Sequence, residues 1–381
     1  MKLDVYSADF SARTTLYSAV SVSSTEFYNG LGKITIVAAG SERNRAALKP
    51  KNVIYDVSSG MTYIIVNVRY DAAADRITAN GYSANWLLSL RAAAKLLKFP
   101  PGFKVGPGVD DVETDIYSVV TDNFCLSALW PTYKADGSTA DLSRLDPRIS
   151  VAATKNLGIH IAPARRYSTY SGDSFPCVLD IVLECLDAVN LGHRMNFDPA
   201  AHTWEFEIYQ GQDKRSVAAF VEEHGTLGGV SFEFDASTFR NVAVVPMFYV
   251  SEELPDGTRA ATMRYFGAGE GADRYETILP MQTEGSDESD YFEDRVKTLA
   301  FKELSKCLSR QTFSVSGIDT SDLGKWFNLG DLVKCVSNRL GIEFDARITC
   351  IRRTFDSRRE TVELVLGDPV LTVLSGQNFV V

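Results

Sequence analysis

The sequence predicts an α+β protein rich in β structure, with two antiparallel β-barrel domains flanking a mixed α+β middle region. At both ends of the chain, apolar residues alternate with polar ones, which is the pattern of strands with one buried and one solvated face. Helical spacing of apolar residues is confined to segments between residues 83 and 309. A chain of 381 residues is long enough for several domains with a sizeable core.

The first 98 residues are predicted to form a β-barrel followed by an exit helix. Strands are expected near Met1–Val5, Leu16–Val22, Ile34–Ala38, Asn52–Val57, Tyr63–Tyr70 and Arg76–Ala79. Many strands without an intervening helix are typical of an antiparallel barrel or sandwich. Gly30 and Gly32 favour a bend rather than a phosphate loop, because a strand and not a helix follows them. The spacing of Ser83–Phe99 then predicts an amphipathic helix that ends before Pro100.

Residues 99–228 are predicted to form an α+β middle domain. A turn-rich linker at Gly102–Asp111 precedes a weaker helix at 112–124 and an irregular polar loop between Pro131 and Arg148, expected to be solvated or, as the alternative, to touch a partner. Ser174 can cap a helix that runs to Gly192, the expected residue after its end. Two strands, Met195–Phe197 and Trp204–Tyr209, then form a hairpin.

Residues 229–310 are predicted to be a segment of strands and one helix, shared between the middle domain and the second barrel. The glycines from Gly267 to Gly271 lack the lysine and the serine or threonine of a P-loop, so we expect no phosphate site there. The acidic run at 283–294 predicts the start of a helix that reaches Ser309, because carboxylates stabilise helix N-termini. A cation site built from this run is the weaker alternative.

Residues 311–374 are predicted to form the second β-barrel, and residues 375–381 a tail. Three strands with one apolar face each, Leu332–Val336, Ile342–Cys350 and Val362–Leu366, follow one another as an antiparallel meander. An amphipathic meander needs a partner sheet or its own closure, because an open sheet leaves unpaired edges.

Composition and motifs exclude several classes of function. The formal net charge of −10 opposes binding to duplex DNA or to an anionic membrane. No apolar run is long enough to span a membrane, and Asp4, Asp9 and Arg13 stand where a secretory signal would be apolar, so we expect the protein to fold in the cytoplasm. The six cysteines and four histidines show no metal-ligand spacing, and no HExxH or GxSxG occurs. The sequence therefore predicts no catalytic residue, no metal and no cofactor.

The C-terminal part of the chain resembles a family of bacteriophage tail proteins. The resemblance rests on Trp326-Phe327-Asn328-Leu329-Gly330-Asp331 before the meander and on Leu366-Gly367-Asp368-Pro369 after it. It extends to the helix and hairpin that contain Asp198, to Gly271–Glu276 and to the helix Asp290–Ser309. The order of β, mixed and β regions is similar to the tail hub, or tail-associated-lysin amino-terminal, family of long-tailed phages, whose fold is similar to the baseplate hub of contractile tails.

This resemblance implies a structural protein of the virion, at the distal tail tip. Members form a homotrimer in which each subunit contributes two barrels, so that six barrels present a pseudo-sixfold ring to the sixfold tail tube. The implied partners are the distal tail ring protein, the tail tube, the tape-measure protein and tip or fibre proteins. The implied lumen is closed before infection and passes DNA during genome ejection without binding it specifically. Many relatives extend further, into a cell-wall hydrolase or a host-attachment fibre, whereas this sequence stops at Val381.

Five residues that frame the meander are the ones we expect to matter for structure or assembly: Trp326, Gly330, Asp331, Gly367 and Asp368. The alternative function is a β protein that binds or degrades cell-wall carbohydrate, which predicts an aromatic-lined groove with two carboxylates. No pair among the 49 acidic residues stands out in the sequence as the acid and nucleophile of a glycosidase, so an enzyme is not expected.

Overall fold

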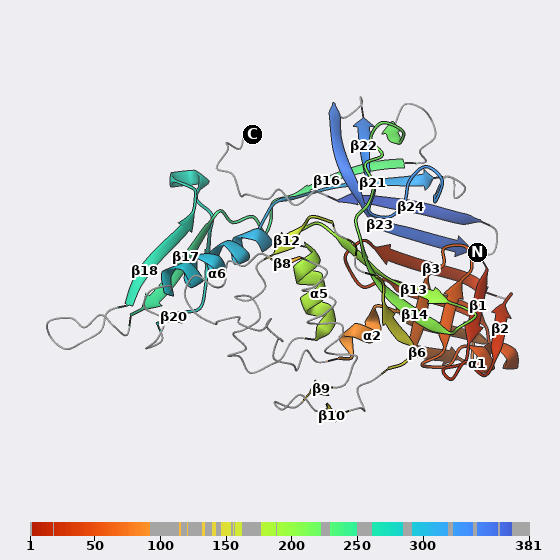
Figure 1. Ribbon diagram of the computed structural model, residues 1–381. Coiled ribbons are helices and arrows are strands. Elements are labelled where there is room, and N and C mark those ends of the chain that lie inside the picture. Colours follow the sequence, from red (N-terminus) through yellow and green to blue (C-terminus); the bar gives the residue numbers. More distant parts are fainter. Residues whose placement is uncertain are drawn as a thin grey trace. The chain divides into compact units, whose positions relative to one another are not determined.

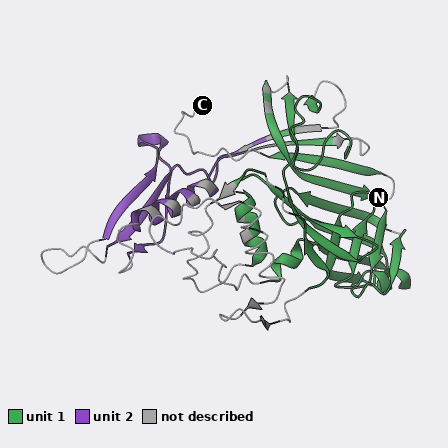
Figure 2. Cartoon of the chain, viewed as in Figure 1, with its two compact units in different colours: residues 1–104, 109–231, 313–367 green, residues 105–108, 232–312, 368–381 purple. Residues whose placement is uncertain are grey.

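The computed structural model describes residues 2–17, 19–91, 114–115, 120, 132–133, 139–141, 146–153, 155, 157–161, 177–187, 189–221, 229–249, 261–284, 292–318, 323–337, 341–356 and 359–367. The chain divides into two compact units, shown in Figure 2: unit 1 holds residues 1–104, 109–231 and 313–367, and unit 2 holds residues 105–108, 232–312 and 368–381. Strands outnumber helices, and the predicted β-rich α+β class is confirmed. No helix in the described part of the chain is long and apolar enough to cross a membrane.

The N-terminal strands of unit 1 form a curled antiparallel sheet (Figure 1). They are β1 (Leu3–Tyr6), β2 (Arg13–Leu16), β3 (Ala19–Phe27), β4 (Lys33–Ala39), β5 (Val53–Asp56), β6 (Thr62–Asp71) and β7 (Arg76–Ser83), in the order β3-β4-β7-β6-β5-β1-β2. Apolar residues from each of them, such as Leu3, Ile36 and Ile65, belong to one buried cluster. The sheet therefore curls around this cluster, while among the described strands β2 and β3 do not pair to close it into the predicted barrel.

Two short helices accompany this sheet. The first, α1 (Glu42–Ala47), begins after Ser41, whose side chain accepts a hydrogen bond from the backbone N–H of Asn44. The second, α2 (Trp86–Ser89), replaces the start of the long helix predicted over Ser83–Phe99. That prediction is wrong at Ser83, because its backbone N–H donates to Gly32 and so extends the strand ladder. Residues 92–99 of the predicted helix lie outside the described residues.

The predicted C-terminal meander is confirmed. It consists of β22 (Leu332–Ser337), β23 (Ile342–Asp356) and β24 (Glu360–Gly367), paired antiparallel in this order. β15 (Ala219–Val221) adds to β22 in parallel. β21 (Arg310–Ile318) and β16 (Gly229–Asp235) continue the sheet beyond β24, and the boundary between the two units falls within these two strands.

The long strand β23 joins the two ends of the chain into one sheet. Its first half pairs with β22, whereas its second half pairs with β3 from Cys350 opposite Phe27 to Asp356 opposite Ser21. Strands from the two predicted barrel regions, 1–98 and 311–374, therefore belong to a single sheet of 13 strands (Figure 1). Among the described strands β2 pairs with β1 alone, and a cavity of about 340 Å³ is lined by residues of both β2 and β3.

The middle region of unit 1 packs a helix and a small sheet against the curled sheet. α5 (Val178–Asp187) and the hairpin of β13 (Gly192–Asp198) and β14 (Thr203–Tyr209) confirm the predicted helix and hairpin, and β11 (Ile149–Val151) pairs with β14 in parallel. Buried residues of α5 and of the hairpin share a core with residues of β1, β5 and β6. The indole N–H of Trp204 donates to Thr62 Oγ1 at 3.0 Å, which links the hairpin to β6.

The end of α5 differs from its prediction. The helix stops at Asp187, and Gly192 begins β13 instead of following the helix as its cap. Asn190 takes the left-handed conformation, with φ of 55°, and Leu191 donates its backbone N–H to Leu186. Asparagine tolerates this conformation better than most residues, so it terminates the helix in the role predicted for glycine.

Besides β11, four short strands are described between residues 114 and 161. β8 (Thr114–Asp115) pairs with β12 (His160–Ile161), and β9 (Thr132–Tyr133) pairs with β10 (Thr139–Asp141). The helix predicted over 112–124 is therefore wrong at its described residues 114 and 115, where a β-branched threonine suits the extended strand. Most of the remaining residues of that predicted helix lie outside the described part of the chain.

Unit 2 consists of a four-stranded sheet backed by one helix. The sheet contains β17 (Val242–Phe248), β18 (Ala261–Gly267), β19 (Glu276–Ile278) and β20 (Gln282–Thr283), with the 3-10 helix η3 (Gly271–Asp273) between β18 and β19. The helix predicted between Asp290 and Ser309 is confirmed as α6 (Phe292–Lys306). Its apolar stripe, which includes Phe292, Val296 and Ala300, packs on alternate residues of β17 such as Val245 and Met247.

Candidate functional site

Tyr28 lies where three distant segments of unit 1 meet. It follows β3 and is 2% exposed. Its backbone N–H donates to Thr349 of β23, and its carbonyl accepts from His193 of β13. Its hydroxyl lies 3.2 Å from the carbonyl oxygen of Tyr209 and 3.3 Å from the backbone nitrogen of Gly211. Through its backbone and its side chain together, Tyr28 thus ties the curled sheet to both the hairpin and the meander. Burial raises the pKa of its hydroxyl.

Glycines allow the backbone to approach the ring of Tyr28 from two sides. A Cβ atom at Gly192 would lie 2.3 Å from ring carbons of Tyr28, and a Cβ at Gly330 would meet the same ring at 2.3 Å. Gly330 also has φ of +92°, which only glycine adopts readily. The guanidinium of Arg347 lies 5.3 Å from the ring centroid and completes the surroundings of Tyr28.

Asp331 fixes the loop that leads into β22. Its side chain is buried and its two oxygens accept backbone N–H groups from separate segments, Gln212 at 2.7 Å and Asn328 at 2.8 Å. Its own backbone carbonyl accepts from Ile348. The buried carboxylate therefore pairs with two backbone donors, and it fastens the segment after β14 to the start of the meander.

The five residues singled out from the sequence do not all come together. Gly330 and Asp331 lie at the Tyr28 junction, as described above. Trp326 is 56% exposed, and its neighbour Phe327 is buried against Phe220 of β15 with ring centroids 5.2 Å apart. Gly367 ends β24 opposite Arg347, and a Cβ there would meet Thr349 Oγ1 at 2.7 Å. Asp368 lies outside the described residues.

A polar cavity of about 470 Å³ lies beside the junction, within unit 1. Its walls come from β3, the β5–β6 turn, the end of β7, the β13–β14 hairpin, the loop before β22 and β23. The side chains that line it include those of Glu26, Asn85, His193, Glu207, Asn328 and Arg353. None of these residues is predicted as a site residue, because they come from separate segments and only Asn328 lies in a motif that carries the family resemblance.

Glu207 in the cavity wall is fully compensated by neighbouring donors. It accepts from Lys155, from Arg194 Nε at 2.8 Å and from Asn196 Nδ2 at 2.9 Å. Burial alone would raise the pKa of Glu207, but the hydrogen bonds from Lys155, Asn196 and Arg194 outweigh it and lower the pKa to about 2. Glu207 is therefore ionised and bound at neutral pH.

Glu26 lies on the opposite wall in a much less polar setting. Its side chain is buried, and its pKa is raised to about 7 by burial, against the opposing attraction of Arg353. The hydroxyl of Tyr63 donates to it at 3.4 Å. Arg353 itself lies 3.6 Å from Asp56, whose carboxylate also accepts from Ser58 Oγ at 2.6 Å. The charges of this wall are thus paired with one another.

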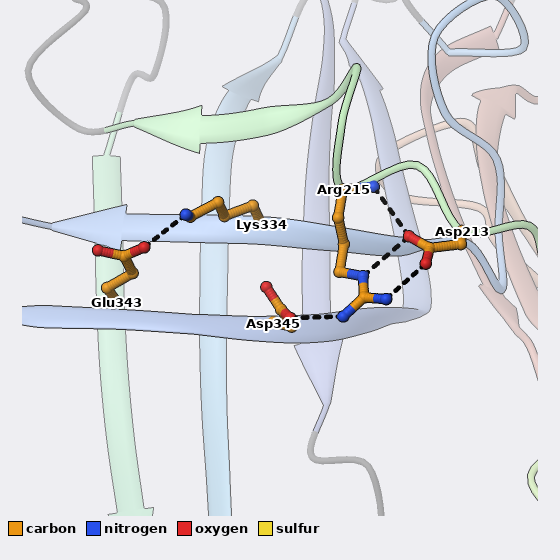
Figure 3. A network of polar contacts seen from close by, with 5 residues as sticks. All are labelled: Asp213, Arg215, Lys334, Glu343 and Asp345. Carbon is orange, nitrogen blue, oxygen red and sulfur yellow. Dashed lines mark hydrogen bonds and ion pairs between the residues drawn. The ribbon is translucent and has the colours of Figure 1, made fainter.

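Charged side chains also connect the segment after β14 to the outside of the meander, as Figure 3 shows. Arg215 pairs with Asp213 at 2.6 Å and with Asp345 of β23 at 2.8 Å. Lys334 of β22 pairs with Glu343 of β23 at 2.5 Å. All five side chains are well exposed, so each pair adds little to stability and the network mainly sets orientation.

No group of three or more metal-ligating side chains occurs among the residues that the structure describes. The acidic run proposed as a weaker cation site lies mostly at residues 285–291, outside this part of the chain. What the described geometry can do chemically is hold distant strands together and accept a polar molecule in the cavity.

Comparison with known proteins identifies the family. Residues 2–368 match a family described as siphovirus ReqiPepy6 Gp37-like protein. The chain belongs to this family. No curated protein matches it.

Solved structures with a fold similar to that of this chain include two phage tail proteins. The tail protein from Neisseria meningitidis MC58 is 14% identical, with a TM-score of 0.56 and coverage of 97% of this chain and 96% of that one. The 43 kDa tail protein of prophage MuSo2 from Shewanella oneidensis is 9% identical, with a TM-score of 0.55 and coverage of 96% and 98%. The family member thus has the fold of these tail proteins over nearly its whole length, and the resemblance to a phage tail family is confirmed.

Proposed function

We propose that this chain is a structural hub protein of the distal tail tip of a siphovirus. Three copies form a ring that joins the sixfold tail tube to a threefold tip, and the lumen of the ring closes before infection and opens for genome ejection. The observation that carries this proposal is the shared fold with tail proteins over 96% or more of this chain, together with membership of a siphovirus family. A structural role without catalysis is consistent with both.

The outer face of the unit 2 sheet supports assembly with a second copy. Apolar side chains on this face and beside it are strongly exposed: Met263 51%, Tyr265 58%, Ile278 70% and Met281 56%. Tyr265 and Ile278 flank Val244 of β17 in adjacent strand positions, so they form one continuous surface. The strand β18 is also an edge of this sheet (Figure 1). Exposed apolar surface beside an unpaired edge is typical of a protein contact.

The sheet of unit 1 supports the ring geometry. In the proposal, each subunit has two barrel modules, formed by residues 1–98 and 311–374. The middle domain is formed by residues 99–228, and the connecting segment by residues 229–310. Three subunits then supply six similar modules around the axis. The net charge of −10 suits a lumen through which DNA slides, since a basic lumen would bind its backbone.

The proposed partners are the distal tail ring protein, the tail tube and the tape-measure protein above the ring, with tip or fibre proteins below it. Trp326, exposed in the loop before β22, is the residue we assign to a contact with one of these neighbours. Gly330, Asp331, Gly367 and Asp368 are assigned the task of holding that loop and the end of β24 in place.

Light scattering on the purified full-length chain tests the trimer. One chain has a mass of 42.0 kDa, so a trimer has three times that mass, about 126 kDa. We expect Ile278→Glu to shift the mass toward the single chain, because it places a charge within the apolar face. Val217→Glu is the matched control and should leave the mass unchanged, since Val217 is 60% exposed but lies in the proposed middle domain, outside both barrel modules and the unit 2 face. A wild-type protein that remains at the mass of one chain at micromolar concentration would contradict the proposal.

A further inference from the structure

The cavity of unit 1 contains buried polar atoms that the protein itself leaves without partners. His193 is 1% exposed, and neither ring nitrogen has a hydrogen-bond partner among the described residues. Asn85 is 4% exposed, and its Oδ1 likewise has no partner in that part of the chain. Both side chains line the cavity. A buried polar atom without a partner costs about 1–3 kcal/mol, so such atoms indicate a bound molecule that pairs with them.

The charged groups around the cavity balance one another, although the buried Nε of Arg353 has no hydrogen-bond partner among the described residues. This balance of charge bears on the charge of the bound molecule. Glu207 is bound by Lys155 and Arg194, and Arg353 faces Asp56 and Glu26. An anion or a cation entering the cavity would have to displace one of these partners. A neutral molecule would not, so the site favours a neutral ligand.

The remaining surface of the cavity contains both donors and acceptors. Burial lowers the pKa of His193 to about 4, so at neutral pH its ring offers one N–H donor and one acceptor nitrogen. Asn85 offers an acceptor oxygen. The other neutral polar side chains in the lining are Ser58, Ser59, Ser83, Gln210, Gln212 and Asn328. A ligand that meets such a surface needs groups that both donate and accept, and the hydroxyl is the simplest of these.

The volume of the cavity and the aromatic side chains in its wall narrow the class of ligand further. A volume of about 470 Å³ lies within the usual range of small-molecule sites, about 300–1,000 Å³. Tyr209 contributes a half-buried ring to the lining, and Phe27 a more exposed one. The face of an aromatic ring packs against the C–H face of a sugar, while the hydroxyls at the edge of the sugar form hydrogen bonds. A sugar can therefore contact the aromatic side chains and the polar side chains of this cavity at the same time.

We propose that this cavity binds a neutral saccharide, held by His193 and Asn85 at its base and by Asn328 and the two glutamines at its rim. The three rim residues are exposed and the two base residues are buried, which gives the cavity one open end. Glu207 is held by three donors and serves as part of the wall, so the site binds without cleaving. The binding site does not depend on the trimer and can be tested on any soluble form of the full chain.

Titration calorimetry with single sugars tests the proposal. The probes are N-acetyl-D-glucosamine, D-galactose and D-glucose, with D-glucuronate and inorganic phosphate as charged counterparts. We expect at least one neutral sugar to bind saturably with a Kd of about 1 mM or lower, and the charged probes to bind at least tenfold more weakly. Absence of saturable binding by every neutral sugar at about 10 mM, or equal binding of D-glucuronate and D-glucose, would overturn it.

Two variants and one control locate the binding. Asn328→Trp places a bulky ring at the exposed rim and should abolish binding, and His193→Phe keeps a ring on Phe206 but removes both nitrogens, which should weaken binding about tenfold. Ala72→Trp adds the same ring to the exposed β6–β7 turn, outside the cavity, and should bind as the wild type does. Thermal melts establish that each variant is folded. Undiminished binding by the folded Asn328→Trp variant would place the sugar elsewhere and refute the proposed site.

Discussion

Replacement of Asp331 by alanine tests the junction directly. The change removes both acceptors for the backbone N–H groups of Gln212 and Asn328, at 2.7 and 2.8 Å. Each unsatisfied donor costs about 1–3 kcal/mol, and we expect a loss of about 3 kcal/mol in the free energy of unfolding of unit 1. Because unit 1 is large, such a loss lowers its Tm by only about 5 °C.

Tryptophan fluorescence during thermal unfolding reports this loss selectively. The four tryptophans are residues 86, 130, 204 and 326, and all of them belong to unit 1. Asp331→Asn keeps one acceptor oxygen and should lose about half as much stability as the alanine variant.

Asp345→Ala is the matched control for Asp331→Ala. Asp345 forms an exposed ion pair with Arg215, which keeps Asp213 as a second partner, so the cost should stay below about 1 kcal/mol. Equal Tm values for Asp331→Ala and Asp345→Ala would refute the assignment of Asp331 as the buried fastener of this loop.

Three further variants probe the same unit. The pKa of Glu26 rises from 4.5 to about 7 on folding, so its contribution to stability, about 3 kcal/mol, is complete below pH 4.5 and is lost as the pH rises toward 7. Glu26→Gln should remove this contribution and the part of the pH dependence of Tm that it causes. An unchanged slope of Tm against pH would contradict this prediction. Tyr28→Phe removes the hydroxyl that donates to Tyr209 and should cost about 1–2 kcal/mol in the same melt, and no measurable cost would show that this bond is not formed. Gly330→Ala should destabilise unit 1 by more than Gly341→Ala does. Both glycines have positive φ, but only a Cβ at residue 330 would meet the ring of Tyr28. Equal losses of stability would show that backbone strain is the whole cause.

Local patterns in the sequence identified most elements, and non-local pairings account for what they missed. The meander and α6 were predictable because alternation and helical spacing persist over many residues in each. The helix α1 escaped because six residues are too few to show a period, although Ser41 is a recognisable cap. The strand β3 was predicted only to Val22, because its continuation through Ser23, Ser24 and Thr25 lacks alternating apolar residues.

The residues of the candidate site likewise fall into those that the sequence predicted and those that it did not. Gly330 and Asp331 were identified because they form a compact segment of sequence that resembles a known family. The role of Tyr28 could not be predicted, since the residues that its hydroxyl contacts lie more than 150 positions away in the sequence. The cavity was not predicted either: Glu26 and His193 lie on strands of two different sheets, and only the folded chain places both in the lining of one cavity.

The pairing of β3 with β23 has a consequence for biosynthesis. During translation, Phe27 emerges long before its strand partner Cys350, so one edge of the N-terminal sheet stays open until nearly the whole polypeptide has been made. Throughout that interval the exposed edge can capture strands from other nascent copies. A chain truncated before residue 350 keeps this liability permanently, and we expect it to aggregate rather than persist as a smaller folded protein.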